Sequence, residues 1–111
     1  MIFDTDVLIQ YGKGHVGATH EIDRAEARHI STQTAMEFLQ GSTSLAIQKA
    51  RRAVLHEMGF EILPLTPNIG HRALVYIEEH ALSNGLRSAD ALIAATAVEN
   101  GFVLCTGLFY P

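Results

Sequence analysis

The four aspartates of this sequence are unevenly spaced, and three of them stand where they could do chemistry. Asp4 and Asp6 come together in the segment DTD, directly after the first apolar run. Asp90 lies in the first turn of GLRSADALIAATAVENGF, a segment that is apolar on nearly every side of a helix. Carboxylates at partly buried positions repel one another unless they are protonated or neutralised by a cation. Hard divalent cations, Mg²⁺ or Mn²⁺, prefer such oxygen ligands, so these residues predict metal chemistry.

The elements that must position these acids alternate between short apolar runs and longer helical patterns. We expect strands at 1–3, 29–31, 60–65 and 102–106, and helices at 19–28, 34–40, 44–58, 67–82 and 89–100. This alternation predicts an α/β domain with a mainly parallel sheet of about four strands and right-handed crossovers. The length of 111 residues predicts one domain, 1–111.

Several helix ends have recognisable signals. Thr66 followed by Pro67 predicts a helix start, with the threonine as cap, and Gly85 predicts the end of the same helix. Ser88 is a plausible cap for the next helix. Asp6 could cap a short helix in VLIQYG. These signals define where the helices meet the strands.

Connectivity places three acids at the same edge of the sheet. Gly101 leaves almost no linker between the 89–100 helix and the 102–106 strand, so the chain must reverse and the two must run antiparallel. Asp90 then lies at the carboxyl edge of the sheet. Asp4 directly follows the first strand, and Glu37 lies near the start of the helix that follows the second. In open α/β sheets that edge is where ligands bind.

Each acid also has a purely structural interpretation. Thr34 and Glu37 fit a capping box at a helix start. Asp90 would be favoured by the dipole of its helix, and Asp4 is a common type of turn residue after a strand. Taken singly these interpretations are as good as the functional one, but together the acids favour a shared site.

Three segments in order, MIFDTDVLI, ISTQTAMEFLQG and LRSADALIAATAVENGFVLCTG, resemble the PIN-domain ribonucleases, and most of all the short VapC-type toxins of prokaryotic toxin–antitoxin pairs. Asp4 matches the acid that ends the family's first strand, and Thr5 matches its hydroxyl neighbour. Glu37 matches the acid of the following helix, and Asp90 the acid of D-A-x-I-A-A-x-A. The resemblance implies a PIN-like three-layer αβα sandwich, a homodimer, Mg²⁺-dependent cleavage of RNA, and inhibition by a small VapB-like antitoxin.

On this basis we expect one or two Mg²⁺ or Mn²⁺ ions to be held by Asp4, Asp90 and Glu37 and to orient water for attack on a phosphodiester. Glu37 would either ligate the metal or act as a base through water. Thr5 and Thr106 are expected to support the site by hydrogen bonds.

Other polar residues are weaker candidates. Asp6 is expected to assist the site only indirectly. The densest basic cluster, KARR, offers Lys49, Arg51 and Arg52 either as phosphate contacts for RNA or as a solvated helix face.

The end of the sequence departs from the family pattern. Leu108 stands where the family has a polar residue, and too few residues follow to make a fifth strand. We therefore expect the last family strand to be missing and metal affinity or activity to be weakened by roughly 10–100-fold. Two alternatives stay open: a catalytically weak or inactive PIN-fold interaction module, and a small metal-dependent phosphatase, which DTD would suit.

Composition limits the remaining classes. With 8 basic and 12 acidic residues the formal charge is −4, which disfavours non-specific coating of nucleic acid. No apolar run reaches the roughly 18 residues of a membrane span, and the first residues carry acids where a signal peptide carries Lys or Arg. We therefore expect a cytoplasmic protein without a membrane segment. Because a single acidic subunit would make a poor groove for RNA, we also expect a homodimer, with apolar residues of the 67–82 helix at its interface.

Overall fold

The computed structural model describes residues 1–106, and these form four strands and six helices. The strands are β1 (Ile2–Phe3), β2 (Arg28–Ser31), β3 (Phe60–Leu63) and β4 (Leu104–Cys105). The helices are α1 (Thr5–Gly12), α2 (Val16–Arg24), α3 (Thr32–Gln40), α4 (Leu45–Glu57), α5 (Pro67–Asn84) and α6 (Ser88–Asn100).

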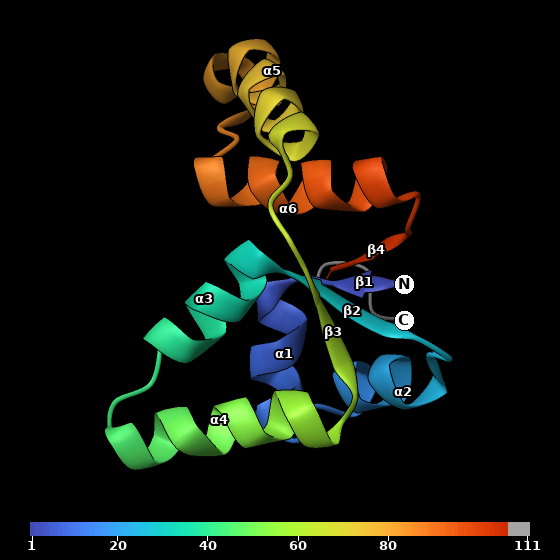
Figure 1. The fold of residues 1–111 in the computed structure, drawn as a ribbon, viewed down its shortest axis with the longest axis vertical. Helices are drawn as coiled ribbons and strands as arrows, with labels where there is room; N and C mark the ends of the chain where they lie inside the picture. The colour runs from blue at the N-terminus through green and yellow to red at the C-terminus, as the bar shows by residue number, and fades with distance from the viewer. Residues whose placement is uncertain (107–111) are drawn as a thin grey trace.

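The four strands form one parallel sheet in the order β3-β2-β1-β4. Ile2 and Phe3 of the central β1 pair with His29 and Ile30 on one side and with β4 on the other. Helices α1 to α4 lie on one side of the sheet and α6 lies on the other (Figure 1). This is the predicted three-layer α/β architecture, with α5 added as an outer layer that packs on α6.

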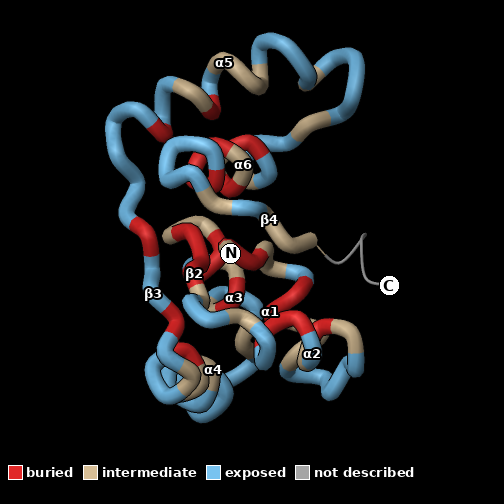
Figure 2. Tube along the Cα trace, turned by 90° about the vertical axis from the view of Figure 1, so that its right-hand side faces the viewer, coloured by how far each residue is buried: buried red, intermediate tan, exposed pale blue. Residues whose placement is uncertain are grey.

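The core explains why these segments become elements. Phe3 is fully buried and meets the ring of Phe60 edge-to-face, with 6.2 Å between the ring centroids. On the other side of the sheet, small residues of α6 such as Ala91 and Ala95 let α5 approach closely through Ile69 and Ala73. Figure 2 shows that α6 is buried along much of its length, whereas α5 is largely exposed. Helix α6 therefore lies between the sheet and α5.

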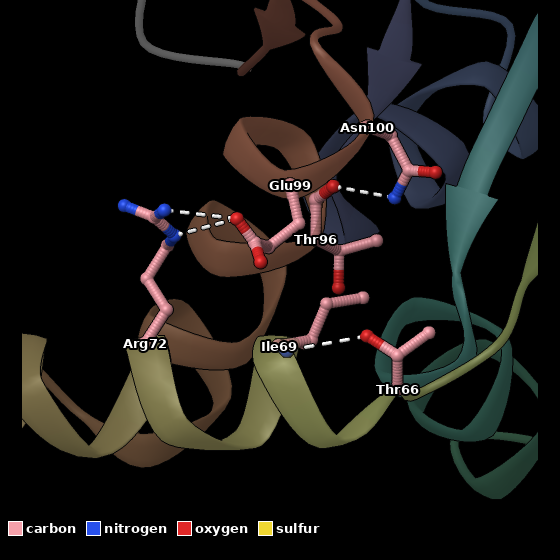
Figure 3. Close-up of polar contacts among 6 residues, drawn as sticks. All are labelled: Thr66, Ile69, Arg72, Thr96, Glu99 and Asn100. Carbon is pink, nitrogen blue, oxygen red and sulfur yellow. Dashed lines mark hydrogen bonds and ion pairs between the residues drawn. The ribbon is translucent and has the colours of Figure 1, made fainter.

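Three predicted helix boundaries are confirmed, the start of α5 and the ends of α5 and α6. The Thr66 hydroxyl accepts a hydrogen bond from the amide of Ile69 at 3.2 Å and so caps α5 (Figure 3). Gly85 and Gly101 end α5 and α6 with φ of 66° and 68°, a left-handed conformation that glycine adopts without steric cost. The second of these glycines turns the chain directly from α6 into the strand segment.

Three predicted caps were wrong. Asp4, and not Asp6, caps the first helix, because α1 begins at Thr5 immediately after the two-residue β1. Ser31 caps α3 by accepting from the amide of Thr34 at 2.9 Å. At α6 the cap position is Arg87, and no side chain caps the helix there.

Other boundaries moved because tertiary pairing prevailed over local pattern. The second helix spans Val16–Arg24 and not 19–28, because Arg28 is already the first residue of β2 and pairs with Phe60. The Arg28 guanidinium donates to the carbonyl oxygens of Ile22 and Met58 at 3.0 and 2.9 Å. Strand β3 ends at Leu63 because Pro64, which follows it, has no amide hydrogen.

Within residues 1–106, no helix is both long enough and apolar enough to cross a membrane.

Candidate metal centre at the carboxyl edge of the sheet

A cleft of about 470 Å³ lies at the carboxyl edge of the sheet, and six polar residues predicted for the site line it: Asp4, Thr5, Asp6, Glu37, Asp90 and Thr106. They come from four different places in the fold. Asp4 to Asp6 lie at the junction of β1 and α1, Glu37 lies on α3, Asp90 on the first turn of α6, and Thr106 just after β4. The parallel sheet brings these ends together, as the connectivity predicts.

Asp4 is held firmly at the floor of this site. Its backbone amide donates to the carbonyl oxygen of Cys105 at 3.1 Å, and its carboxylate accepts from the amide of Val7 at 3.1 Å. The pKa of Asp4 is raised to about 6, mainly because the carboxyl is partly buried and also because the negative charges of Asp6 and Asp90 lie near, while the hydrogen bond from Val7 opposes the rise. Burial is thus the main cause of the raised pKa, and the nearby charges of Asp6 and Asp90 add to it.

Glu37 is oriented by a neighbouring hydroxyl. The hydroxyl of Thr5 donates to the Glu37 carboxylate at 2.8 Å, and it lies 3.4 Å from the hydroxyl of the fully buried Thr34. The capping-box interpretation of Thr34 and Glu37 is wrong, because Ser31 caps this helix and Thr34 lies inside it. The Glu37 side chain points across to α1, where it joins the cleft.

Two further residues of the cleft have no hydrogen-bond partner for their side chains among residues 1–106. Asp90 is exposed on the first turn of α6. The hydroxyl oxygen of Thr106 is buried yet has no hydrogen-bond partner within the described part of the chain. A buried polar atom without a partner costs free energy, so this hydroxyl is suited to a ligand or a ligand's water molecule.

The donor set suits a hard divalent cation. Asp4, Glu37 and Asp90 offer carboxylate oxygens, and Thr106 offers a hydroxyl that has no partner within the described residues. Burial first, and then the charges of Asp6 and Asp90, raise the pKa of Asp4, and a cation would offset both costs of its ionisation. The side chains of this donor set are not converged on one point: among residues 1–106, no three His, Cys, Asp or Glu side chains are close enough to hold one metal ion together. Mg²⁺ usually keeps several water ligands and needs only one or two carboxylates, so a shared cleft meets its requirement.

The basic cluster lies elsewhere. Lys49, Arg51 and Arg52 are on α4, and none of them lines the cleft. Arg51 donates to the carbonyl oxygen of Phe38 at 2.6 Å, and its guanidinium lies 4.9 Å from the centre of that ring. Arg51 therefore anchors α4 to α3, and a contact of this cluster with RNA stays a prediction.

Sequence reasoning missed the apolar wall of the cleft. Leu86, Ile93, Ala94 and Leu104 line it beside the acids. Apolar residues carry no chemical motif, so only the helical repeat of α6 could have indicated that Ile93 and Ala94 share the side of Asp90.

We expect the ionisation of Asp4 to destabilise the metal-free fold. The pKa of Asp4 in the folded protein, about 6, lies above the ordinary 3.8. The contribution of protonated Asp4 to the free energy of unfolding is therefore fully present below pH 3.8 and is lost as the pH rises through about 6. This difference corresponds to about 3 kcal/mol, and solvent screening of a partly exposed group reduces the expected loss to about 1–2 kcal/mol. Urea unfolding from about pH 4 to 7 measures it, and Asp4→Asn should lack this part of the slope. Equal pH dependence in both proteins would contradict the assignment.

Comparison with known proteins places the fold. A search of curated proteins found no match. Among solved structures, a toxin–antitoxin complex from Klebsiella pneumoniae is similar, with a TM-score of 0.79 and 27% identity over 93% of this chain and 82% of that one. VapBC2 from Rickettsia felis, bound to a DNA fragment from its promoter, has a TM-score of 0.75 and 17% identity, over 94% of this chain and 86% of that one. FitAcB from Neisseria gonorrhoeae has a TM-score of 0.70 and 19% identity, over 93% of this chain and 84% of that one.

The family comparison covers nearly the whole sequence and includes every acid of the cleft. The model of the PIN domain matches residues 1–107. Together with the parallel sheet and the acids at its carboxyl edge, this match shows that the chain belongs to the PIN domain family.

Proposed function

We propose that this protein is a metal-dependent endoribonuclease toxin of the VapC type, neutralised by a VapB-like antitoxin. The observation that carries the proposal is the cleft, which is lined by carboxylates from α3, α6 and the β1–α1 junction. PIN domains are generally nucleases. The similar Klebsiella pneumoniae structure is a toxin–antitoxin complex, which supports the antitoxin partner.

In this proposal Asp4, Asp90 and Glu37 hold Mg²⁺ or Mn²⁺, with one or two of the carboxylates binding the ion directly and the rest through its water ligands. When bound, a divalent cation lowers the pKa of water and neutralises charge that develops on a phosphodiester. The protein's own residues prepare the site for this chemistry. Thr5 fixes the Glu37 carboxylate by the 2.8 Å hydrogen bond, so Glu37 is positioned to ligate or to take a proton from water. Thr106 provides a hydroxyl free to hold a water molecule or a phosphate oxygen.

Metal binding should stabilise the protein. We expect Mg²⁺ or Mn²⁺ to raise the melting temperature, with about 2.7 kcal/mol of stabilisation at a hundredfold excess over Kd. Asp4→Asn should remove this stabilisation, and Asp23→Asn, which changes an exposed acid of α2 outside the cleft, should retain it. Cleavage of a labelled RNA panel in the same buffers tests the activity. If neither ion raises the melting temperature of the wild type, while saturable binding is measured at another site, the proposed metal centre is wrong.

We further propose a homodimer formed through α5. Leu74 and Leu82 are large apolar side chains with exposures of 56% and 104%. Within residues 1–106 the cleft itself is lined by no Lys or Arg, so a second subunit would bring basic residues to RNA. Sedimentation velocity should show a dimer at about tens of micromolar, and Leu82→Glu should shift it to monomer. A wild-type monomer at that concentration would contradict the interface.

Of the two alternatives, the phosphatase finds no support among the described residues, since no lysine lines the cleft to hold a phosphoryl group. The weak or inactive interaction module rests on Leu108, which lies outside the described residues. That alternative therefore stays a prediction, to be decided by the RNA panel.

A further inference from the structure

A second hollow, which we call the α5 pocket, adjoins the acidic cleft. It measures about 340 Å³ and is lined by Tyr76, His80 and Asn84 of α5 together with Leu86 and Ala94. Leu86 and Ala94 also line the cleft, so the two hollows share a wall. The cleft and the α5 pocket therefore lie next to each other, on either side of Leu86 and Ala94.

The polar lining of the α5 pocket follows the helical repeat. Tyr76, His80 and Asn84 are each four residues apart, so they form one stripe along α5 on successive turns. The His80 ring lies 3.2 Å, through Nδ1, from the amide oxygen of Asn84. Leu74 and Leu82 lie two residues from Tyr76 and His80, about 200° away around the helix. A dimer formed through those leucines would leave the α5 pocket open.

The aromatic wall of the α5 pocket is held in place. The Arg72 guanidinium interacts with the Tyr76 side chain and also donates hydrogen bonds to Glu99. These interactions raise its pKa. Its bonds to the Glu99 carboxylate measure 3.1 and 2.8 Å and join α5 to α6 (Figure 3). Arg72 thus fixes α5 against α6 one helical turn before Tyr76, so the helix face that presents the Tyr76 ring is held in place.

We propose that the α5 pocket binds a nucleobase of the RNA strand next to the scissile phosphate, an inference that rests on the proposed nuclease function. Unpaired bases are recognised by stacking on Tyr or His rings and by hydrogen bonds to their edges, and this stripe supplies both kinds of group. Its volume falls in the range of about 300–1,000 Å³ that is usual for ligand pockets. The acidic cleft is lined by no aromatic residue within 1–106, so a base has no stacking partner there.

The experiment is an abasic scan of a short labelled RNA, in which one nucleotide at a time lacks its base. Binding is measured to the Asp90→Asn protein with Mn²⁺, and cleavage is measured with wild type. We expect loss of one base beside the cut to weaken binding by about 5- to 100-fold. When His80→Ala or Tyr76→Leu is added to the Asp90→Asn protein, binding should no longer depend on that one base, while its dependence on the other bases should stay the same. Tyr76→Phe, which keeps the ring, and His71→Ala, an exposed histidine of α5 outside the α5 pocket, should retain it.

The outcomes separate this inference from the proposed function. If wild type cuts RNA but no base matters more than another, or the sensitivity survives His80→Ala and Tyr76→Leu, the nucleobase pocket is overturned and the nuclease stands. If wild type cuts nothing yet base-dependent binding through His80 is found, the nuclease fails and the pocket stands. If neither cleavage nor base-dependent binding occurs, both are overturned. A change of sedimentation on His80→Ala without any base effect would reassign the pocket to a contact between copies.

Discussion

Asp4→Asn is expected to lower RNA cleavage by at least about 100-fold while leaving the metal-free protein as stable as wild type or more so. Loss of an outer-shell partner alone typically costs about 10–100-fold in metal affinity or activity, and Asp4 is proposed to touch the metal itself. Asparagine caps a helix as well as aspartate does, so the hydrogen bond from Val7 is kept. It also carries no charge, so it avoids the cost of a buried carboxylate and the repulsion from Asp6 and Asp90, which together raise the pKa of Asp4.

Two control variants separate chemistry from folding. Asp4→Ala should also lose activity, and it should be about 1 kcal/mol less stable than Asp4→Asn, because it removes the cap of α1 as well as the charge. Asp23→Asn should keep both properties. Single-turnover cleavage of the best RNA of the panel and urea unfolding without metal measure the two effects. If Asp4→Asn cuts RNA within a few-fold of wild type, Asp4 is only a helix cap, and the proposed metal centre is wrong.

Phe3→Ala is expected to cost about 3–5 kcal/mol of unfolding free energy, the largest stability effect we predict for one substitution. Phe3 is fully buried in the central strand and packs edge-to-face on Phe60. The cost combines lost apolar burial with the cavity left between the sheet and the helices beneath it. A domain of this kind is stable by about 5–15 kcal/mol in total, so the variant will be marginal at 37 °C.

Urea unfolding at 25 °C measures this effect from the midpoint and slope of the transition. Leu82→Ala is the matched control, since Leu82 is fully exposed and its loss should change stability by no more than about 0.5 kcal/mol at low protein concentration. A cost below about 1 kcal/mol for Phe3→Ala would show that β1 is not the centre of the core. Since Asp4 directly follows Phe3, that result would also mean that β1 does not fix the position of Asp4 in the cleft.

Much of the fold was predictable from sequence because its signals are local. The Thr66-Pro67 start, the glycine after Asn84 and the glycine after Asn100 each act within a few residues, through capping or a left-handed turn. Alternation of apolar runs with helical patterns was enough to predict the parallel sheet. Once a parallel sheet is assumed, connectivity alone brings Asp4, Glu37 and Asp90 to one edge.

Only the tertiary structure decided which residue did which task. Asp4 and Asp6 are the same residue type two positions apart, and only the length of β1 made Asp4 the cap. Arg51 belonged to a basic cluster in sequence, but its hydrogen bond to the Phe38 carbonyl depends on how α4 crosses α3. The bond from Thr5 to Glu37 and the stripe at Tyr76, His80 and Asn84 beside Leu86 join segments far apart in the chain. Capping and turns act over a few residues and leave a pattern in the sequence, whereas contacts between distant side chains depend on helix angles and packing that no local pattern records.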